Sequence, residues 1–391
     1  MALTLIEPNL LNFARNPIVF RATTDKHLVA EESMLRIACS VEFGVTGSPD
    51  RTYATELSQP VENGGTASFN LSDPSQTLIQ RMLAELDMSG SSAFGHVGLY
   101  GTATFCELWI MDGAEVRGEV VTSRRFYVVP GGFTDFELLS RGGIDLLGIT
   151  AGGKRMSRKP DGGILYRGET LIVPTLMGID PANGDAEVKE SIFSLRVEEY
   201  NYGSGSTMSQ IISQGSTGIT GNAVDYHRAA TTAGESDGRF VFSSSTTDDV
   251  VGHFCTNTHG VHFLRFVNGF GAVENIAVRA KDKLSYEVSG ETHSLVQGIS
   301  TRPTDRRYAT KSQPVGVYEL SSGYVPKQWA EWYVQELLTS PKVWIQLDGQ
   351  WVPALIEAED DCVIYDRTKP EMPHVDFTLR LAIDGVTGIT W

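Results

Sequence analysis

Two apolar runs flank an Asp-Gly pair in the stretch Lys342-Val-Trp-Ile-Gln-Leu-Asp-Gly-Gln-Trp-Val-Pro-Ala-Leu-Ile356. An Asp-Gly pair between strand-length apolar runs is typical of a two-residue β-hairpin turn, because Asp and Gly adopt the positive φ angles that the turn requires. We therefore predict an antiparallel hairpin that turns at Asp348-Gly349. Two further apolar runs, at 362–365 and 375–382, extend the prediction to a sheet.

A helix is predicted immediately before this hairpin, over residues 325–338. Pro326 stands in its first turn, and Ser340-Pro341 ends it. Its apolar side chains recur at helical spacing: Trp329, Trp332, Tyr333 and Leu337. Because its other faces are polar, we expect the helix to lie on its own sheet and to bury Trp329 or Trp332 there. A partner-binding or glycan-binding face is the alternative for these aromatic side chains.

The composition extends the β prediction to the whole chain. Glycine occupies 40 of 391 positions, and charged residues make up 20% of the chain. Ordinary proteins have roughly 7% glycine and roughly 25% charged residues. A glycine-rich, charge-poor chain favours many short strands joined by tight turns. The expected fold is mainly β, with two or three linked antiparallel β-sandwich or β-rich domains and short covering helices.

Three sections are expected along the chain. Residues 1–130 are predicted to form an N-terminal β-sandwich with one helix, for which Asp73 would be the N-cap. Residues 131–283 are predicted to form a Gly/Ser/Thr-rich β domain, with the tract 202–221 as loop or weakly ordered strand. Residues 284–391 are predicted to form the C-terminal helix packed on its antiparallel sheet.

The net charge excludes whole classes of partner. The chain has 32 basic and 48 acidic side chains, so its formal charge is 32 − 48 = −16. Such acidity disfavours binding of nucleic acid or of an anionic membrane surface by the general surface of the protein. No export signal is evident in the N-terminal sequence, and no stretch reaches the roughly 20 apolar residues of a membrane span. We expect a protein that stays in the cytoplasm where it is made, or leaves it by a route that needs no signal, such as cell lysis.

Four cations stand within six residues on this acidic chain: Lys154, Arg155, Arg158 and Lys159. The preceding residues match the GxxxxGK pattern of a phosphate-binding loop, but Arg155 replaces the Ser or Thr that holds Mg²⁺. We therefore interpret the segment as a solvated basic loop or as a contact with an acidic partner protein.

Four side chains that bind soft metals lie within ten residues: His253, Cys255, His259 and His262. They are the weak metal candidates of the chain, and they would converge only if 253–262 were one hairpin. The spacing matches no known zinc pattern, and an ordinary core or surface hairpin is the alternative. The sequence has no recognisable catalytic motif, so we expect neither enzymatic activity nor a cofactor.

Several segments, in order, resemble a family of minor virion proteins from phages and prophages of Bacteroidetes. They are Asn16-Pro-Ile-Val-Phe20, Gly65-Thr-Ala-Ser-Phe-Asn-Leu71, Val128-Val-Pro-Gly-Gly132, the basic segment 154–160, Leu264-Arg-Phe-Val-Asn-Gly-Phe-Gly271, Leu337-Leu-Thr-Ser-Pro-Lys-Val343 and Trp351-Val-Pro353. The resemblance implies a structural component of a tail, baseplate or fibre, with no catalytic residues carried over.

The implied protein would act through interfaces. Its expected partners are other tail proteins and further copies of itself in a homo-oligomer, and its expected location is the virion. A carbohydrate-binding or adhesion module at a tail tip, with a host glycan as ligand, is the alternative. A β-rich hydrolase is a third hypothesis, which would require two carboxylates roughly 5–10 Å apart in a groove.

Overall fold

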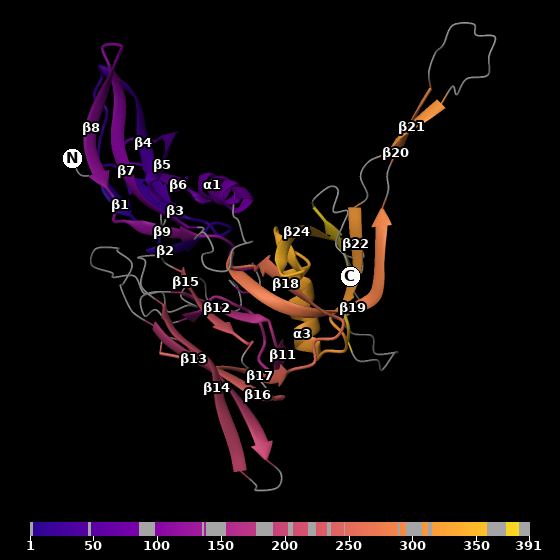
Figure 1. Cartoon of the computed structure of the whole chain (residues 1–391). Coiled ribbons are helices and arrows are strands. Elements are labelled where there is room, and N and C mark those ends of the chain that lie inside the picture. The colour runs from indigo at the N-terminus through magenta and orange to yellow at the C-terminus, as the bar shows by residue number, and fades with distance from the viewer. Residues whose placement is uncertain are drawn as a thin grey trace, which may run out of the picture.

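The computed structural model of the chain is mainly β, as predicted. It describes residues 3–45, 48–85, 98–134, 137, 154–176, 191–201, 206–217, 224–232, 236–245, 247–287, 290–294, 307–311, 315–357 and 373–382. Sheets and a closed barrel form three β units, which follow one another along the chain from indigo to yellow (Figure 1).

The first unit is a β-sandwich. One sheet has the order β1 (Thr4–Ile6), β3 (Val19–Thr23), β6 (Thr66–Asn70). The other has the order β2 (Leu11–Phe13), β9 (Phe126–Val129), β7 (Leu99–Met111), β4 (Glu32–Val45), β5 (Ser48–Pro60), and β8 (Ala114–Thr122) pairs with β7. Phe20, Phe69 and Phe105 lie between the sheets and are almost completely buried, which makes this unit a sandwich with its own apolar core.

The helix of this unit, α1 (Ser72–Glu85), covers the sandwich core with Ile79 and Met82. It begins at Ser72, so the prediction of Asp73 as N-cap was wrong. The backbone N–H of Ser72 donates instead to Oδ1 of Asn70 at 3.1 Å. The amide side chain of the preceding strand therefore satisfies a free N–H at the start of the helix.

The second unit packs a small sheet on a larger one. The small sheet has the order β10 (Lys154–Arg155), β12 (Thr170–Leu176), β15 (Val224–Ala230). The larger has the order β11 (Gly163–Tyr166), β17 (Val250–Cys255), β16 (Gly238–Ser244), β13 (Ser191–Asn201), β14 (Ser206–Thr217). Leu171 and Val173 pack against Leu195 and Phe242 between them. The part of the Gly/Ser-rich tract 202–221 that the structure describes, residues 206–217, is all strand β14, because β13 supplies its backbone partners; one register shift interrupts the ladder.

The third unit is a closed barrel with the order β18 (Val261–Val267), β19 (Val273–Glu287), β22 (Val315–Ser321), β25 (Asp376–Leu381), β24 (Gln350–Glu357), β23 (Val343–Leu347). The hairpin β23–β24 turns at Asp348-Gly349, where both residues have positive φ, as predicted. The expected boundary at 283 is wrong, since β18 pairs with β23 and β19 with β22. The barrel begins at Val261, because β18 pairs with its neighbour β19 and with β23, which lies some 80 residues later in the sequence.

The predicted C-terminal helix consists of α3 (Lys327–Trp332) and the π-helical turn η2 (Tyr333–Leu337). Trp329 and Trp332 are 5% and 3% exposed, which confirms their burial. The ring of Trp332 meets that of Phe266 edge to face, with centroids 5.7 Å apart. The helix thus packs its aromatic face on the barrel strands.

A common apolar core joins the three units. It contains Phe13 and Phe133 from the first unit and the segment after it, Met156 and Ile172 from the second, and Phe270 from the barrel. The rings of Phe13, Phe133 and Phe270 lie 5.0 to 5.8 Å from one another. The units are therefore packed together and not merely linked.

The chain backbones also meet directly at this core. The N–H of Gly132 donates to the carbonyl of Gly269 at 3.0 Å. Gly131 and Gly271 have φ of 80° and 75°, and a Cβ added at Gly271 would lie 1.9 Å from Pro130. Glycine is required at Gly271 both for its positive φ and for this close approach.

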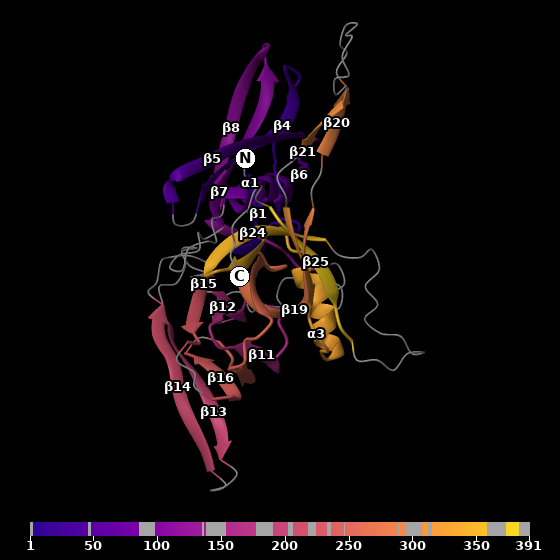
Figure 2. The same ribbon diagram turned by 45° about the vertical axis from the view of Figure 1, so that its right-hand side comes forward.

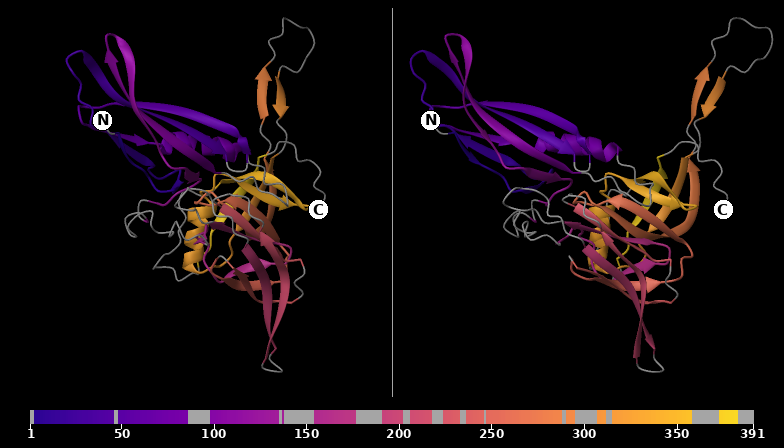
Figure 3. Two further views of the ribbon diagram at one scale, coloured as in Figure 1. Left: turned by 90° about the vertical axis from the view of Figure 1, so that its left-hand side faces the viewer. Right: turned by 60° about the vertical axis from the view of Figure 1, so that its left-hand side comes forward.

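Hairpins extend beyond the packed body in three directions. The far ends of β4, β5, β7 and β8 project on one side, the β13–β14 hairpin projects at the opposite end, and β20 (Gly290–Ser294) with β21 (Arg307–Lys311) forms a separate arm (Figures 1 and 2). The same three projections are distinct in the views of Figure 3.

Candidate functional site: an ionic junction between the β units

The predicted basic segment lies where the three units meet. Lys154 and Arg155 form β10, which pairs with β12. Met156 is fully buried in the common core, and the segment then crosses toward the barrel. Burial of Met156 fixes the position of the two cations that follow it, Arg158 and Lys159. Their interpretation as a solvated loop is corrected by the contacts described next.

Arg158 binds two carboxylates that are far apart in the sequence. Its Nε and Nη2 donate to the two carboxylate oxygens of Glu137, each at 2.8 Å, and its Nη1 donates to Oε1 of Glu336 at 2.7 Å. Nη2 also donates to the carbonyl of Gly132 at 3.1 Å. The guanidinium lies 3.9 Å from the centre of the Phe270 ring. A planar, five-donor cation is suited to bridging these groups simultaneously.

The electrostatics of this cluster follow from its burial. Burial opposes the charge on Arg158, but the hydrogen bonds to Glu137 and the charge of Glu336 raise the pKa of Arg158 nonetheless. Burial likewise opposes ionisation of Glu137, and Arg158 holds the pKa of that carboxyl below its usual value. Glu336 is only 2% exposed, and its Oε2 accepts the backbone N–H of Gly269. The three side chains thus form a mutually compensated group.

Lys159 occupies a second buried polar cluster. Its Nζ donates to the carbonyl of Asn275 on β19 at 2.9 Å and lies about 6 Å from the rings of Trp329 and Trp332. Burial raises the pKa of the Glu169 carboxyl to about 7, and the charge of Lys159 partly opposes this rise. Burial also raises the pKa of Glu274, whose Oε1 accepts from Asn268. Lys159 therefore ties the second unit to both barrel and helix.

Arg155 forms the outer part of the junction. Its Nη1 lies 3.3 Å from Asp161 and its Nη2 donates to the carbonyl of Lys159 at 2.7 Å. Beside it is a cleft of about 690 Å³, whose described lining includes Phe133, Ser157, Pro160, Phe270 and Gln328. The cations of this lining are balanced by Glu137, Asp161 and the buried Glu336. Such an arrangement holds chain segments together better than it attracts a free phosphate.

The predicted metal ligands are not brought together. His253 and Cys255 lie on β17 in the second unit, whereas His262 lies on β18 in the barrel, so 253–262 is not a hairpin. His253 is exposed, and His259 is exposed in the connection between the two strands. The described residues contain no group of three or more His, Cys, Asp or Glu side chains placed to hold a metal ion. His262 packs against Tyr318, and burial lowers its pKa.

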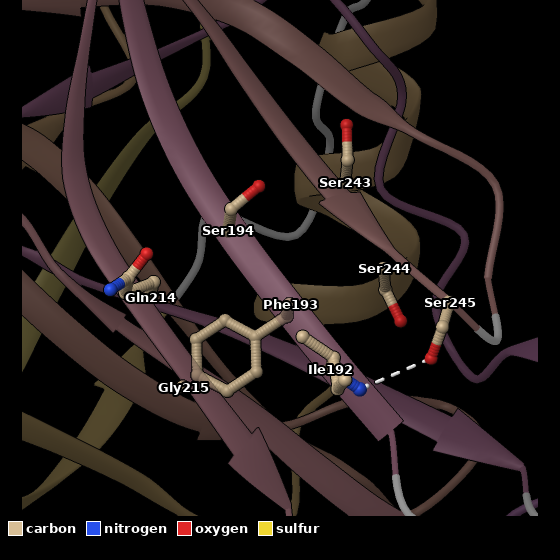
Figure 4. A pocket seen from close by; sticks show the side chains of 8 residues that line it. All are labelled: Ile192, Phe193, Ser194, Gln214, Gly215, Ser243, Ser244 and Ser245. Carbon is tan, nitrogen blue, oxygen red and sulfur yellow. Dashed lines mark hydrogen bonds between the residues drawn. The ribbon is translucent and has the colours of Figure 1, made fainter.

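A second hollow, of about 760 Å³, lies over the end of the larger sheet of the second unit (Figure 4). Its described lining comprises Ile192, Phe193, Ser194, Gln214, Gly215 and the serines 243–245. Ser245 Oγ accepts the N–H of Ile192 at 3.1 Å, the contact dashed in the figure. The described linings of both hollows contain no Trp or Tyr, the side chains on which sugars stack.

Sequence reasoning missed the carboxylates of the junction. Glu336 had a detectable signal, because it lies seven residues after Trp329 and four after Trp332, on the apolar face of the helix. A charge on that face predicts a buried ionic partner. Glu137, Glu169 and Glu274 had no comparable signal, since their partners come from distant parts of the chain.

Comparison with known proteins does not assign the chain to a family. No family model matches the chain, and no curated protein matches it. Among solved structures, native E. coli alpha-2-macroglobulin is 8% identical over 82% of this chain and 21% of its own, with a TM-score of 0.22. Invasin, a bacterial integrin-binding protein, is 9% identical over 90% of this chain and 63% of its own, with the same TM-score.

Trypsin-activated alpha-2-macroglobulin from Escherichia coli is 10% identical, over 96% of this chain and 21% of its own, again with a TM-score of 0.22. The chain spans less than two thirds of the length of each of these proteins. Likenesses at this level carry no argument about function.

No helix in the described part of the chain is long and apolar enough to cross a membrane.

Proposed function

We propose that the chain is a structural component of a phage tail, baseplate or fibre, which acts through protein–protein interfaces and self-assembly. The observation that carries the proposal is a body of three β units packed around one junction, from which hairpins extend in three directions (Figures 1 and 3). The motif resemblance to minor virion proteins of Bacteroidetes phages and prophages supports the same role. The proposed location is the virion, assembled in the host cytoplasm.

The projecting strands give a physical reason for assembly with neighbouring subunits. β8 has both of its faces largely exposed along Ala114–Thr122. An isolated hairpin is at best marginally stable in water, so strands that extend beyond their own core gain most from packing against a neighbour. A subunit that presents several such hairpins on a fixed body can contact several neighbours at defined angles.

The ionic junction holds the three β units in a fixed arrangement. Arg158, Glu137 and Glu336 connect the segment after the first unit, the second unit and the barrel helix in one group of hydrogen bonds. Packed and ion-paired contacts of this kind resist relative rotation of the units. A tail component that transmits force between its neighbours requires such resistance.

Deleting the gene tests the role. We expect particles from the deletion strain to lack a tail, baseplate or fibre structure in electron micrographs, and to recover it when the wild-type chain is supplied in trans. A second complementation with a chain lacking the β20–β21 arm is expected to restore the structure incompletely. Particles of normal structure and infectivity in the deletion strain would overturn the proposal.

A further inference from the structure

The free edge of the larger sheet in the second unit is unusual in its chemistry. β14 is the last strand of that sheet and pairs only with β13 in the part of the chain that the structure describes. Its 12 residues, Ser-Thr-Met-Ser-Gln-Ile-Ile-Ser-Gln-Gly-Ser-Thr, include no charged residue and no proline. Natural sheet edges are normally protected from pairing by charges, by proline, by shortness or by β-bulges. β14 has no charge and no proline and is 12 residues long; its ladder with β13 has one register shift, between Leu195 and Arg196, and is otherwise continuous.

The lack of charge extends beyond the strand itself. From Tyr200 to Val224, 224 − 200 + 1 = 25 consecutive residues carry no charge, the longest such run in a chain with net charge −16. The adjacent strand β13, by contrast, carries Arg196, Glu198 and Glu199. Of the two strands of this hairpin, only the edge strand β14 lacks charged residues.

Exposed apolar side chains accompany the unpaired backbone. Met208 and Ile211 of β14 are 63% and 60% exposed, while the neighbouring Ile212 turns inward and is 8% exposed. The hairpin that carries them projects from the body, so a second strand can reach its edge (Figures 1 and 2). Pairing along this edge would satisfy free N–H and C=O groups and cover the two apolar side chains.

We propose that β14 pairs antiparallel with β14 of a second copy of this chain, about a twofold axis near Ile211, to join two five-stranded sheets into one continuous sheet. The absence of charge on β14 is the reason to expect a second copy of the chain as the partner. Two chains of charge −16 repel each other over most of their surfaces, and a neutral edge lets the copies meet without like charges opposite one another. A partner recognised by opposite charge would find no charged side chain on this strand to pair with.

This inference deepens the proposed assembly role and rests on it. The direct test is the mass of the purified chain by size-exclusion chromatography with light scattering. We expect the wild type to have twice the subunit mass and Ile211→Lys to have the subunit mass at the same concentration, because the variant places two lysines at the axis. Ile164→Lys is the matched control, since Ile164 is an exposed isoleucine, 47% accessible, on the opposite edge strand β11 of the same sheet.

Folding is checked separately by circular dichroism and thermal unfolding. If Ile211→Lys fails to fold, Ser209→Pro provides a second variant: Ser209 lies opposite Glu198, whose backbone groups face β16, so proline at 209 removes an N–H from the free edge and leaves the β13–β14 ladder intact. A monomeric wild type, or a dimer that Ile211→Lys and Ser209→Pro both leave intact, overturns the pairing. A monomer that is nevertheless found in particles refutes only the pairing, whereas a dimer absent from particles refutes the virion role.

Discussion

Removing the Arg158 side chain is the sharpest perturbation of the junction. Arg158→Ala leaves the Glu336 carboxylate, 2% exposed, without its cation. Breaking a buried ion pair from one side costs about 3–5 kcal/mol, because a charge remains in a site that excludes water. Glu137 is 24% exposed and can recover part of its hydration, so we assign the cost mainly to Glu336. We therefore expect Arg158→Ala to lower the free energy of unfolding by about 3–5 kcal/mol.

The assay is urea unfolding followed by tryptophan fluorescence and circular dichroism. Arg51→Ala is the matched control, because Arg51 and its partner Glu85 are 52% and 43% exposed and such pairs contribute about 1 kcal/mol or less. The double variant Arg158→Ala/Glu336→Gln removes both charges. It should recover about 0.5–3 kcal/mol relative to the sum of the single variants Arg158→Ala and Glu336→Gln, the usual scale of coupling between contacting residues.

Two results would refute this reasoning. A cost below about 1 kcal/mol for Arg158→Ala would place the pair among weak surface contacts. Additive single variants would show that Arg158 and Glu336 act independently.

Three further predictions address burial and close packing. Burial raises the pKa of Glu169 to about 7 in the folded chain, from its usual value of 4.5. Below pH 4.5 the carboxyl is protonated in both the folded and the unfolded chain. As pH rises from 4.5 to 7 only the unfolded chain loses this proton, so the contribution of Glu169 to the free energy of unfolding should fall by about 3 kcal/mol in total. Glu169→Gln should flatten that part of the stability profile, and equal slopes for variant and wild type would contradict it. Trp332→Ala should cost about 3–5 kcal/mol in urea unfolding, because the ring is buried against Phe266, and a cost under about 1 kcal/mol would mean that it is not. Gly271→Ala should lower the melting temperature through its clash with Pro130, and an unchanged melting temperature would show that the approach is not tight.

Local signals predicted the elements but not their partners. The turn at Asp348-Gly349 and the burial of Trp329 and Trp332 depend on residues close in the sequence, and both were confirmed. The assignment of Val261–Val267 to the second section failed, because the partner strand β23 lies some 80 residues later. Strand pairing over such distances is decided by packing of the whole chain, which periodicity does not record.

The candidate site shows the same limit. Four neighbouring cations on an acidic chain correctly marked an unusual segment, but composition favoured a solvated surface for it. The structure places Arg158 and Lys159 in a junction because distant carboxylates and aromatic rings, among them Glu336 and Phe270, surround them. Exposure of a cation depends on neighbours that a local pattern does not identify.

Quantitative mass spectrometry of purified phage particles from the strain that carries the gene tests the central claim most directly. The proposed role predicts this chain in particles at a fixed copy number relative to the major tail protein, retained through density-gradient purification and salt washes. Particles that contain every other tail protein but none of this chain would contradict it.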